Sequence, residues 1–343
     1  MKYEGEKNYK HGSKKRLGIL ITNLGTPDRP NKKAVKIYLK EFLSDPRVIE
    51  IPKLIWQIIL RGIILNVRPR KVAKLYKSIW SKNGGPLLVM LKKQKKGIQK
   101  NLKQKRKDVK IEIAMRYGNP SIEKGLINLK RLGCRRILIL PLYPQYCAAT
   151  IGSTFDKVTE ILRKWRWIPE IRFVNGYFDD PFYIDCLVKS IKKSWKKKGR
   201  AQKIIFSYHG VPKKYLLKGD PYYCFCQKTT RLVVEKMKLK KNDYITTFQS
   251  RFGPQEWLTP YTDKTLKKLP KKNIKSVDII SPGFSSDCLE TLEELEVENK
   301  VNFLSSGGEK FNYINCLNDD PQHLKMLSFL VQKHTKGWLE NKI

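Results

Sequence analysis

The chain is poor in acidic residues and in histidine, and it lacks a hydrophobic run long enough to cross a bilayer. Its 71 lysines and arginines face 31 aspartates and glutamates, so the formal net charge is +40, and it has only 4 histidines. The most apolar stretch, residues 51–65, is interrupted by Gln57 and Arg61. Such a stretch is typical either of a core helix or of an exposed lip that touches a membrane or an apolar ligand, and the sequence leaves both interpretations open.

Motifs of several other protein classes are missing as well. No Gly-x-Gly-x-x-Gly follows a predicted strand, no Gly-x-x-x-x-Gly-Lys-Ser/Thr occurs and no nucleophile elbow is present, which argues against nucleotide chemistry and serine hydrolysis. The basic residues are spread over the whole chain without zinc-finger spacing or an RNA-binding motif, so nucleic-acid binding is not favoured. The charge also fits an anionic membrane, a carboxylate-bearing small molecule, or a compositional drift without a partner.

The seven cysteines are scattered and odd in number, and no signal peptide precedes them. This pattern is typical of reduced thiols, so we expect a cytoplasmic protein. The one close pair, Cys224 and Cys226, is separated by a single residue, which is too few for a zinc knuckle. We interpret this pair as structural.

A duplication within the sequence is the main clue to the fold. Three apolar runs that end in polar turns, and one Asp-Asp-Pro segment, recur in the same order in the second half. The first-half segments are residues 17–27, 111–120, 137–141 and 175–181, and their counterparts are residues 204–212, 244–254, 277–282 and 315–321. Because helical patterns separate the apolar runs, the sequence predicts two similar Rossmann-like α/β domains with parallel sheets flanked by helices. Ligands bind outside the carboxyl ends of such strands, so we expect the repeated turns to face one cleft between the domains.

The spacing of the repeats indicates an insertion in the first half, because the interval from Gly25 to Gly118 is far longer than the interval from Gly210 to Gly253. We expect a helical insertion over about residues 45–97 that forms a lip of the pocket. The predicted division is a disordered basic tail (1–15), an N-terminal α/β domain (16–175), a C-terminal α/β domain that carries the metal site (176–320), and a C-terminal helix and tail (321–343).

An acidic stretch stands out in this basic chain. Residues 281–295 follow a predicted strand and open a predicted helix, on which Asp287, Glu290 and Glu294 would share one face at i, i+3 and i+7. A structural alternative remains open, since Asp287 and Glu290 also match a capping box that only satisfies backbone N–H groups.

His209 ends another predicted strand. Its counterpart in the first half is Leu24, so the turn itself does not require an imidazole. An imidazole that faces the acidic stretch would hold a divalent ion loosely and would accept protons near neutral pH.

Several longer motifs resemble those of the ferrochelatases, the enzymes that insert ferrous iron into a porphyrin at the last step of haem synthesis. The likeness covers about residues 18–334 and rests on residues 23–27, 143–146, 207–212, 219–222, 249–258 and 284–294. It implies the class II chelatase fold with an active cleft between the two domains, and a lyase that inserts Fe²⁺ into protoporphyrin IX, releases two protons and yields protohaem. The alternatives are a related cobalt or coproporphyrin chelatase, and a basic protein that binds haem or nucleic acid.

The resemblance also implies roles for individual residues. His209 matches the catalytic histidine of the metal site and Glu290 its partner carboxylate, while Asp287 and Glu294 continue an acidic path for protons or metal. The matches to the porphyrin pocket are Arg116, Phe284, Tyr143, Arg68, Lys71, Ser250 and Arg251. The last four of these are candidates for the porphyrin propionates, because cations and hydroxyls bind carboxylates.

Iron is expected as a substrate, without a permanently bound cofactor. Some relatives hold an iron–sulfur cluster in a C-terminal extension, and because no cysteine follows Cys316 we expect none here. Cys288 stands where some relatives have a histidine, and no role is assigned to it. We expect a monomer that binds porphyrin and haem, without nucleic acid, and with possible peripheral membrane contact through residues 51–65. The sequence leaves open whether His209 accepts protons or delivers iron.

Overall fold

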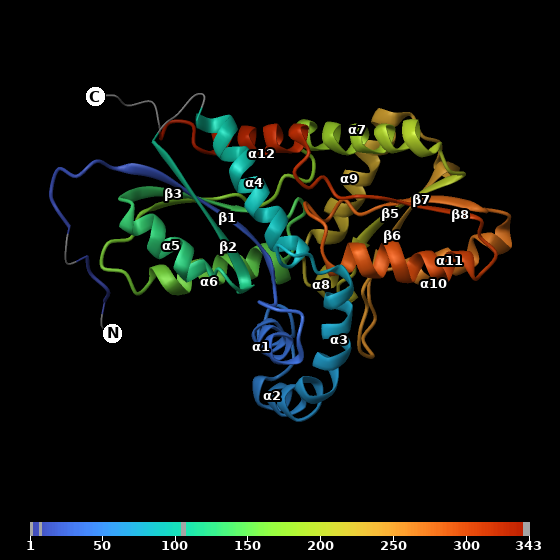
Figure 1. Cartoon of the computed structure of the whole chain (residues 1–343), viewed down its shortest axis with the longest axis horizontal. Coiled ribbons are helices and arrows are strands. Elements are labelled where there is room, and N and C mark those ends of the chain that lie inside the picture. The colour runs from blue at the N-terminus through green and yellow to red at the C-terminus, as the bar shows by residue number, and fades with distance from the viewer. Residues whose placement is uncertain (1–2, 7–8, 104–107, 339–343) are drawn as a thin grey trace. The chain divides into compact units, whose positions relative to one another are not determined.

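The structure is a computed structural model that describes residues 3–6, 9–103 and 108–338. The chain divides into two compact units (Figure 1). Unit 1 comprises the described residues of Met1–Leu142, Ala148–Gly176 and Leu324–Ile343, and unit 2 comprises Tyr143–Cys147 and Tyr177–His323.

Unit 1 is built on a four-stranded parallel sheet of order β2-β1-β3-β4. Its strands are β1 (Arg16–Thr26), β2 (Val109–Gly118), β3 (Cys134–Pro141) and β4 (Glu170–Phe173). The central strand β1 is apolar on both faces, which is typical of a parallel strand covered on both sides. Figure 1 shows α5 and α6 on one face of the sheet and α4 and α12 on the other. These helices are α4 (Pro86–Lys103), α5 (Ile122–Arg131), α6 (Ser153–Leu162) and α12 (Pro321–His334).

Unit 2 repeats this arrangement with a parallel sheet of order β6-β5-β7-β8. Its strands are β5 (Lys203–His209), β6 (Tyr244–Gln249), β7 (Ser276–Ile280) and β8 (Lys310–Ile314). The first strand of each unit lies between the second and the third, so the predicted duplication and fold class are confirmed. Helices α7 and α9 cover one face, and α10, α11 and the helix η5 cover the other (Figure 1). Their bounds are α7 (Pro181–Lys198), α9 (Tyr222–Met237), α10 (Thr262–Lys268), η5 (Glu290–Asn299) and α11 (Lys300–Leu304).

Short helical segments complete both units. They are the π-helical η2 (Ala148–Gly152), α8 (Lys213–Leu217), and the 3₁₀ turns η3 (Lys241–Asp243) and η4 (Pro270–Lys272).

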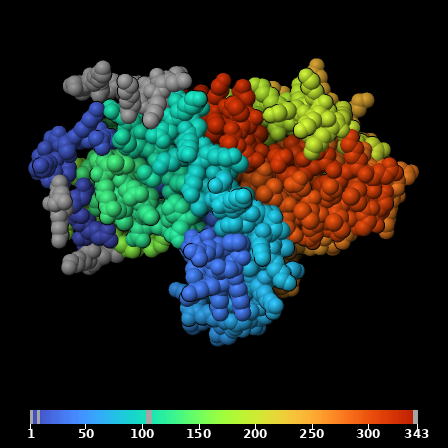
Figure 2. All heavy atoms as spheres, in the orientation of Figure 1, coloured from blue at the N-terminus to red at the C-terminus, as the bar shows by residue number. Residues whose placement is uncertain are grey.

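The expected insertion, about residues 45–97, lies largely in a group of helices in unit 1, but its last residues belong to α4, which packs on β1 and β2. The group consists of α1 (Lys32–Leu43), α2 (Lys53–Ile59), the π-helical turn η1 (Leu60–Ile64) and α3 (Leu65–Ile79). In Figure 2 these blue to cyan residues form a lobe that stands away from the green residues of the same unit. The stretch 51–65 buries Trp56 and Leu60, whereas Leu54 is 83% and Ile58 75% exposed. The stretch is therefore an amphipathic helix with an apolar outward face, and not a fully buried core helix. Among the described residues, none of the helices is long and apolar enough to span a membrane.

The beginning of the chain differs from the expected disordered tail. Residues 3–6 and 9–15, here called the N-terminal strap, lie against unit 1. The backbone N–H of Glu4 donates to Lys164 O at 2.7 Å, and the Arg166 N–H donates to Glu4 O at 2.9 Å. Both guanidinium nitrogens Nη1 and Nη2 of Arg135 donate to the carboxylate of Glu6 at 2.6 Å. The sequence could not reveal this strap because its partners in the rest of unit 1 are far away in the chain, from Asp108 for Lys14 to Lys164 for Glu4.

The carboxyl end of β1 requires glycine. Gly25 has φ +136°, and a Cβ there would lie 1.9 Å from the backbone oxygen of Tyr117 in β2. Gly118 at the end of β2 has φ +83°, and a Cβ there would lie 2.7 Å from the backbone oxygen of Thr26. The carboxyl ends of β1 and β2 therefore approach each other backbone to backbone.

Replacing Gly25 tests this close approach. We expect Gly25→Ala to lower the free energy of unfolding by about 3 kcal/mol or more, because a strained φ costs about 1–3 kcal/mol and the overlap with β2 must also be relieved. Gly62→Ala is the matched control, since nothing lies within 4 Å of its added Cβ. Urea denaturation of both variants measures the difference, and equal stability would show that the turn adapts to a side chain.

Candidate active site

His209 is the last residue of β5, and its backbone is in register with Gln249 at the end of β6. Its Nδ1 lies 2.6 Å from the carbonyl oxygen of Gly210. A carbonyl oxygen only accepts hydrogen bonds, so Nδ1 carries a proton, and in the neutral imidazole Nε2 is the nitrogen with the lone pair. The hydroxyl of Tyr222 donates to His209 O at 2.9 Å, and the Phe284 ring centroid lies 6.4 Å from the imidazole centroid. The half-buried imidazole is thus oriented with one nitrogen available for a metal ion or a proton.

Asp287 is a structural anchor of the turn that leads into η5. One carboxylate oxygen accepts from Tyr313 Oη at 2.6 Å, from Thr291 Oγ1 at 3.1 Å and from the Cys316 N–H at 3.3 Å. The other accepts from Asn318 Nδ2 at 2.6 Å and from Asn315 Nδ2 at 3.2 Å. Five donors occupy both oxygens of this buried group, which holds the turn to the segment after β8.

The segment Glu290–Asn299 is a π-helix of ten residues. The sequence pattern predicted an α-helix, and this prediction is wrong for η5. Because a π-helix bonds residue i to i+5, its turns are wider than those of an α-helix, and the expected i, i+3, i+7 alignment with Asp287 does not apply. Glu290, Glu294 and Glu298 interact instead, since the charges of both neighbours raise the pKa of Glu294. Long π-helices are rare, and π-helical turns are frequent at functional sites.

Glu294 is held by the turn after β6. The Ser250 N–H donates to one oxygen of the Glu294 carboxylate at 2.8 Å, and the Ser250 hydroxyl donates to the other. Ser250 adopts φ +64° in this turn, a region unfavourable for residues other than glycine. Gln249 Nε2 lies 3.5 Å from the same carboxylate and donates to Glu290 O at 2.8 Å. Burial first, and then the Glu290 charge, raise the pKa of Glu294 to about 7, although the Ser250 bonds act in the opposite direction.

Gln249 links the imidazole to the acidic helix. Its backbone pairs with His209, its amide donates to η5, and its Oε1 accepts from Ser207 Oγ at 2.7 Å. The structure thus places His209, Phe284, Glu290 and Glu294 around one set of strand ends in unit 2. Cys288, beside this set, is buried, and burial raises its thiol pKa well above the usual value, so the thiol stays protonated.

Arg251 and Tyr143 also belong to unit 2. Nη2 of Arg251 donates to Asp263 at 3.0 Å, and its guanidinium lies 4.2 Å from the ring centroid of Tyr261. Tyr143 is half-buried in the turn between β3 and η2.

Three of the predicted porphyrin ligands belong to unit 1. Nη2 of Arg116 donates to Asp45 at 2.5 Å, and its Nε donates to Ser153 Oγ at 2.7 Å. The Tyr117 hydroxyl also donates to Asp45, at 2.8 Å, and burial followed by the Asp45 charge raises the pKa of this phenol. Nη2 and Nε of Arg116 are therefore committed to a buried network.

Arg68 and Lys71 lie three residues apart on α3, which places them on one helical face, and both are exposed.

A resident metal centre is not formed by these side chains. Within residues 3–6, 9–103 and 108–338, no group of three or more His, Cys, Asp or Glu side chains is placed to hold a metal ion. One imidazole nitrogen, with the carboxylates of η5 at the same set of strand ends, suits a divalent ion that binds weakly and moves on.

Three residues were missed by the sequence analysis. Gln249 precedes Ser250 in a motif that was recognised, and its role depends on strand pairing that the sequence does not specify. Tyr222 approaches His209 from the start of α9. Glu298 continues the four-residue spacing of Glu290 and Glu294. This spacing could have indicated from the sequence that Glu298 belongs to the same row of carboxylates.

Comparisons with known proteins agree on one family. The profile of the ferrochelatase family matches residues 16–335. The protein named ferrochelatase from Thioalkalivibrio sulfidiphilus is 53% identical over 99% of this chain and 92% of its own length. The ferrochelatase from Marinobacter nauticus is 53% identical over 98% of this chain and 92% of its own.

Solved structures show the same fold. SirB from Bacillus subtilis with Fe³⁺ matches with a TM-score of 0.54 at 13% identity, over 94% of this chain and 96% of its own. The sirohydrochlorin chelatase SirB from Bacillus subtilis subspecies spizizenii, in complex with cobalt, matches with a TM-score of 0.51 at 10% identity. This match covers 94% of this chain and 97% of that chain. At these identities the likeness shows the fold alone.

The raised pKa of Glu294 predicts a pH-dependent stability. A carboxyl whose pKa rises from 4.5 to about 7 on folding contributes stability that is complete below pH 4.5 and is lost as the pH rises through about 7. The glutamine of Glu294→Gln cannot ionise. At pH 8 we therefore expect the free energy of unfolding of this variant to exceed that of the parent by about 3 kcal/mol at most.

Urea denaturation between pH 5 and pH 8 measures this difference. Glu309→Gln, at an exposed position of unit 2, is the control and should follow the parent at every pH. A parent and a Glu294→Gln variant whose stabilities change in parallel over this range would contradict the raised pKa.

Proposed function

The chain belongs to the ferrochelatase family, and from this premise we propose that it is a lyase that inserts Fe²⁺ into protoporphyrin IX. Two pyrrole protons leave as iron enters, and protohaem is the product. Iron is a substrate in this reaction and not a resident cofactor. The observation that carries the proposal is the imidazole of His209, whose Nδ1 is fixed on Gly210 O so that Nε2 is free to act.

His209 and Glu290 are proposed to be the catalytic pair. A neutral Nε2 either receives a pyrrole proton or binds the incoming iron, and both acts need the lone pair that the Nδ1–H bond to Gly210 preserves. Glu290 begins the row of carboxylates on η5, and Gln249, the strand partner of His209, donates to its backbone oxygen. The row would supply oxygen ligands or proton acceptors at the strand ends that carry the imidazole.

Glu294 and Glu298 are proposed to extend this row as a path for protons or metal. A carboxyl with a pKa of about 7 exchanges its proton readily near neutral pH, which suits Glu294 to a relay. Asp287 was assigned to the same path by resemblance. Its five hydrogen bonds support instead a role in fixing the turn that presents Glu290.

The porphyrin ligands are proposed in two groups. Phe284 and Tyr143 offer aromatic surface to the macrocycle. Among the cations, Arg68 and Lys71 are the preferred partners of the propionates, because both are exposed on one face of α3. The other three candidates, Arg116, Ser250 and Arg251, each donate to a carboxylate of the protein.

Replacing His209 tests the catalytic assignment. We expect His209→Ala to insert iron, or zinc as a surrogate, at least about a hundredfold more slowly, because a general acid–base group contributes about 10²–10⁴ in rate. Binding of protoporphyrin, followed by fluorescence quenching, should change little. His11→Ala, in the N-terminal strap, is the control and should retain full activity. Undiminished metal insertion by His209→Ala would refute the proposed mechanism.

We also propose that the apolar face of residues 51–65 makes peripheral contact with a membrane. Four apolar side chains of this stretch are exposed, namely Leu54 (83%), Ile55 (55%), Ile58 (75%) and Ile63 (61%). Val67 on α3 is also exposed, at 70%. The exposed cations Lys53 and Arg61 occur in the same stretch. An amphipathic helix with apolar and basic exposed residues is typical of binding to an anionic lipid surface.

Vesicle binding tests the membrane proposal. We expect the variant Leu54→Ser/Ile58→Ser to lose most of its co-sedimentation with vesicles that contain anionic lipid, because about 1.5–3 kcal/mol per buried apolar side chain is removed. The control is Ile168→Ser/Val301→Ser, which removes two side chains of similar type that are 54% and 60% exposed. Equal co-sedimentation of the two variants would reject this face as the contact.

A further inference from the structure

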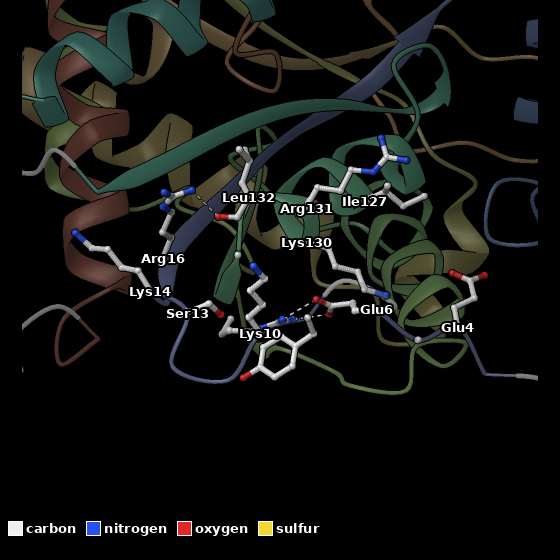
Figure 3. Close-up of a pocket in the computed structure, with 14 residues that line it drawn as sticks. Glu4, Glu6, Lys10, Ser13, Lys14, Arg16, Ile127, Lys130, Arg131 and Leu132 are labelled. Carbon is white, nitrogen blue, oxygen red and sulfur yellow. Dashed lines mark hydrogen bonds and ion pairs between the residues drawn. The ribbon is translucent and has the colours of Figure 1, made fainter.

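A hollow of about 690 Å³ lies between the N-terminal strap and the amino ends of β1 and β3 in unit 1 (Figure 3). This volume falls in the range of small-molecule sites. The substrate sites of α/β sheets lie at the opposite, carboxyl ends of the strands. The hollow is therefore separate from the strand ends that carry the proposed function.

The wall of the hollow is strongly basic. It carries six cationic side chains and two carboxylates, namely Lys10, Lys14, Arg16, Lys130, Arg131 and Arg135, with Glu4 and Glu6. One of the six is neutralised within the wall, because Arg135 binds Glu6 through two hydrogen bonds of 2.6 Å. The Arg135 guanidinium also lies 4.0 Å from the ring centroid of Trp167, which fixes this pair in place.

The other cations are poorly compensated. Lys14 pairs with Asp108, but the two side chains are 66% and 63% exposed, so the pair is weak. Arg16 donates to a neutral acceptor, the carbonyl oxygen of Leu132, at 3.1 Å (Figure 3). Among the described residues, Lys10 and Lys130 make no ion pair within 4 Å. Lys130 lies over the Trp165 ring at 4.4 Å, and its charge helps to lower the pKa of Glu6 after the larger effect of Arg135.

The helix α5 offsets little of this charge. It ends at Arg131, and the carboxyl end of a helix carries roughly half of a negative elementary charge. Several cations that are only partly compensated therefore line one concave surface, from the strap on one side and from β1 and α5 on the other.

We propose that this basic hollow binds a small anion that carries two or more phosphate groups. An anion with a single charged group cannot contact cations of the strap, β1 and α5 at the same time. A chain of phosphates can, because it presents several oxygens along its length. The shared chemistry is the phosphate chain, and its source is either a nucleoside triphosphate or an inorganic polyphosphate. Lys10 and Lys14 of the strap and Arg16 and Lys130 of the body supply the contacts.

The strap makes the site possible. It contributes Lys10 and Lys14, and it is held on unit 1 by the Glu6–Arg135 pair and by the backbone bonds of Glu4 to Lys164 and Arg166. Binding of the anion therefore adds contacts between the strap and the sheet.

Isothermal titration calorimetry on the full chain tests the proposal. The probes are inorganic tripolyphosphate and ATP, each without divalent metal and at fixed ionic strength, so that neither iron nor porphyrin is involved. We expect saturable binding of one anion per chain. Lys10→Gln/Lys14→Gln should weaken it by about tenfold or more, because two charge-assisted contacts are lost. Equal affinity for the two probes would assign the site to the phosphate chain, and tighter binding of ATP would assign it to a nucleotide.

The matched control is Lys92→Gln/Lys100→Gln, which removes the same charge from two exposed positions of α4 in the same unit. This variant should bind the probes as the parent does. Equal weakening in both variants, binding that does not saturate, or a preference for single-stranded DNA with a stoichiometry that grows with its length would indicate a diffuse basic surface and overturn the proposal. The rate of metal insertion should be unchanged in both variants.

Discussion

The hydrogen bonds between the half-buried carboxyl group of Glu294 and Ser250 are the interaction that ties the acidic helix to the turn after β6 in unit 2. An acid in this position is unfavourable when ionised, because it is removed from water and lies beside Glu290 and Glu298. The Ser250 N–H and hydroxyl offset part of this cost, but they reach the carboxylate only because Ser250 adopts a left-handed conformation. A strained turn, a long π-helix and a row of like charges thus meet at one place. Each of these features lowers the stability of the fold. Features of this kind tend to gather at functional sites, because they do not contribute to folding itself.

The carboxylates of the acidic stretch have separate tasks that the sequence cannot distinguish. Asp287, Glu290 and Glu294 have similar side chains and regular spacing, so a pattern treats them as one row. The structure separates them by their partners. Asp287 is saturated with donors, most of them from β8 and the segment after it, whereas among the described residues Glu294 has donors only from Ser250 and Gln249. Whether a carboxylate anchors a turn or exchanges protons is decided by the number of donors around it, and those donors come from distant segments.

The parts of the fold that depend on local pattern were predictable from the sequence. Apolar runs that end in polar turns gave the strands, and their recurrence gave the two similar sheets and the strand-end position of His209. The π-helix was not predictable, because residues 290–299 have the composition of an ordinary α-helix. The N-terminal strap was also missed, since a basic, polar segment indicates disorder unless distant partners such as Arg135 are known. The same long-range dependence explains why the basic hollow is invisible in a sequence with lysines everywhere.

The duplication also separates scaffold from chemistry. Arg116 near the end of β2 in unit 1 and Arg251 just after β6 in unit 2 occupy equivalent positions of the repeat, and each is held in the same manner. Each guanidinium pairs with an aspartate and lies over a tyrosine ring, at 4.5 Å from the centroid for Arg116 and 4.2 Å for Arg251. A feature that both halves share is explained by the demands of the repeated fold, and it gives little information about catalysis. His209 has no such counterpart, because Leu24 stands at the equivalent turn. The chemistry therefore rests on what the second half does not share with the first.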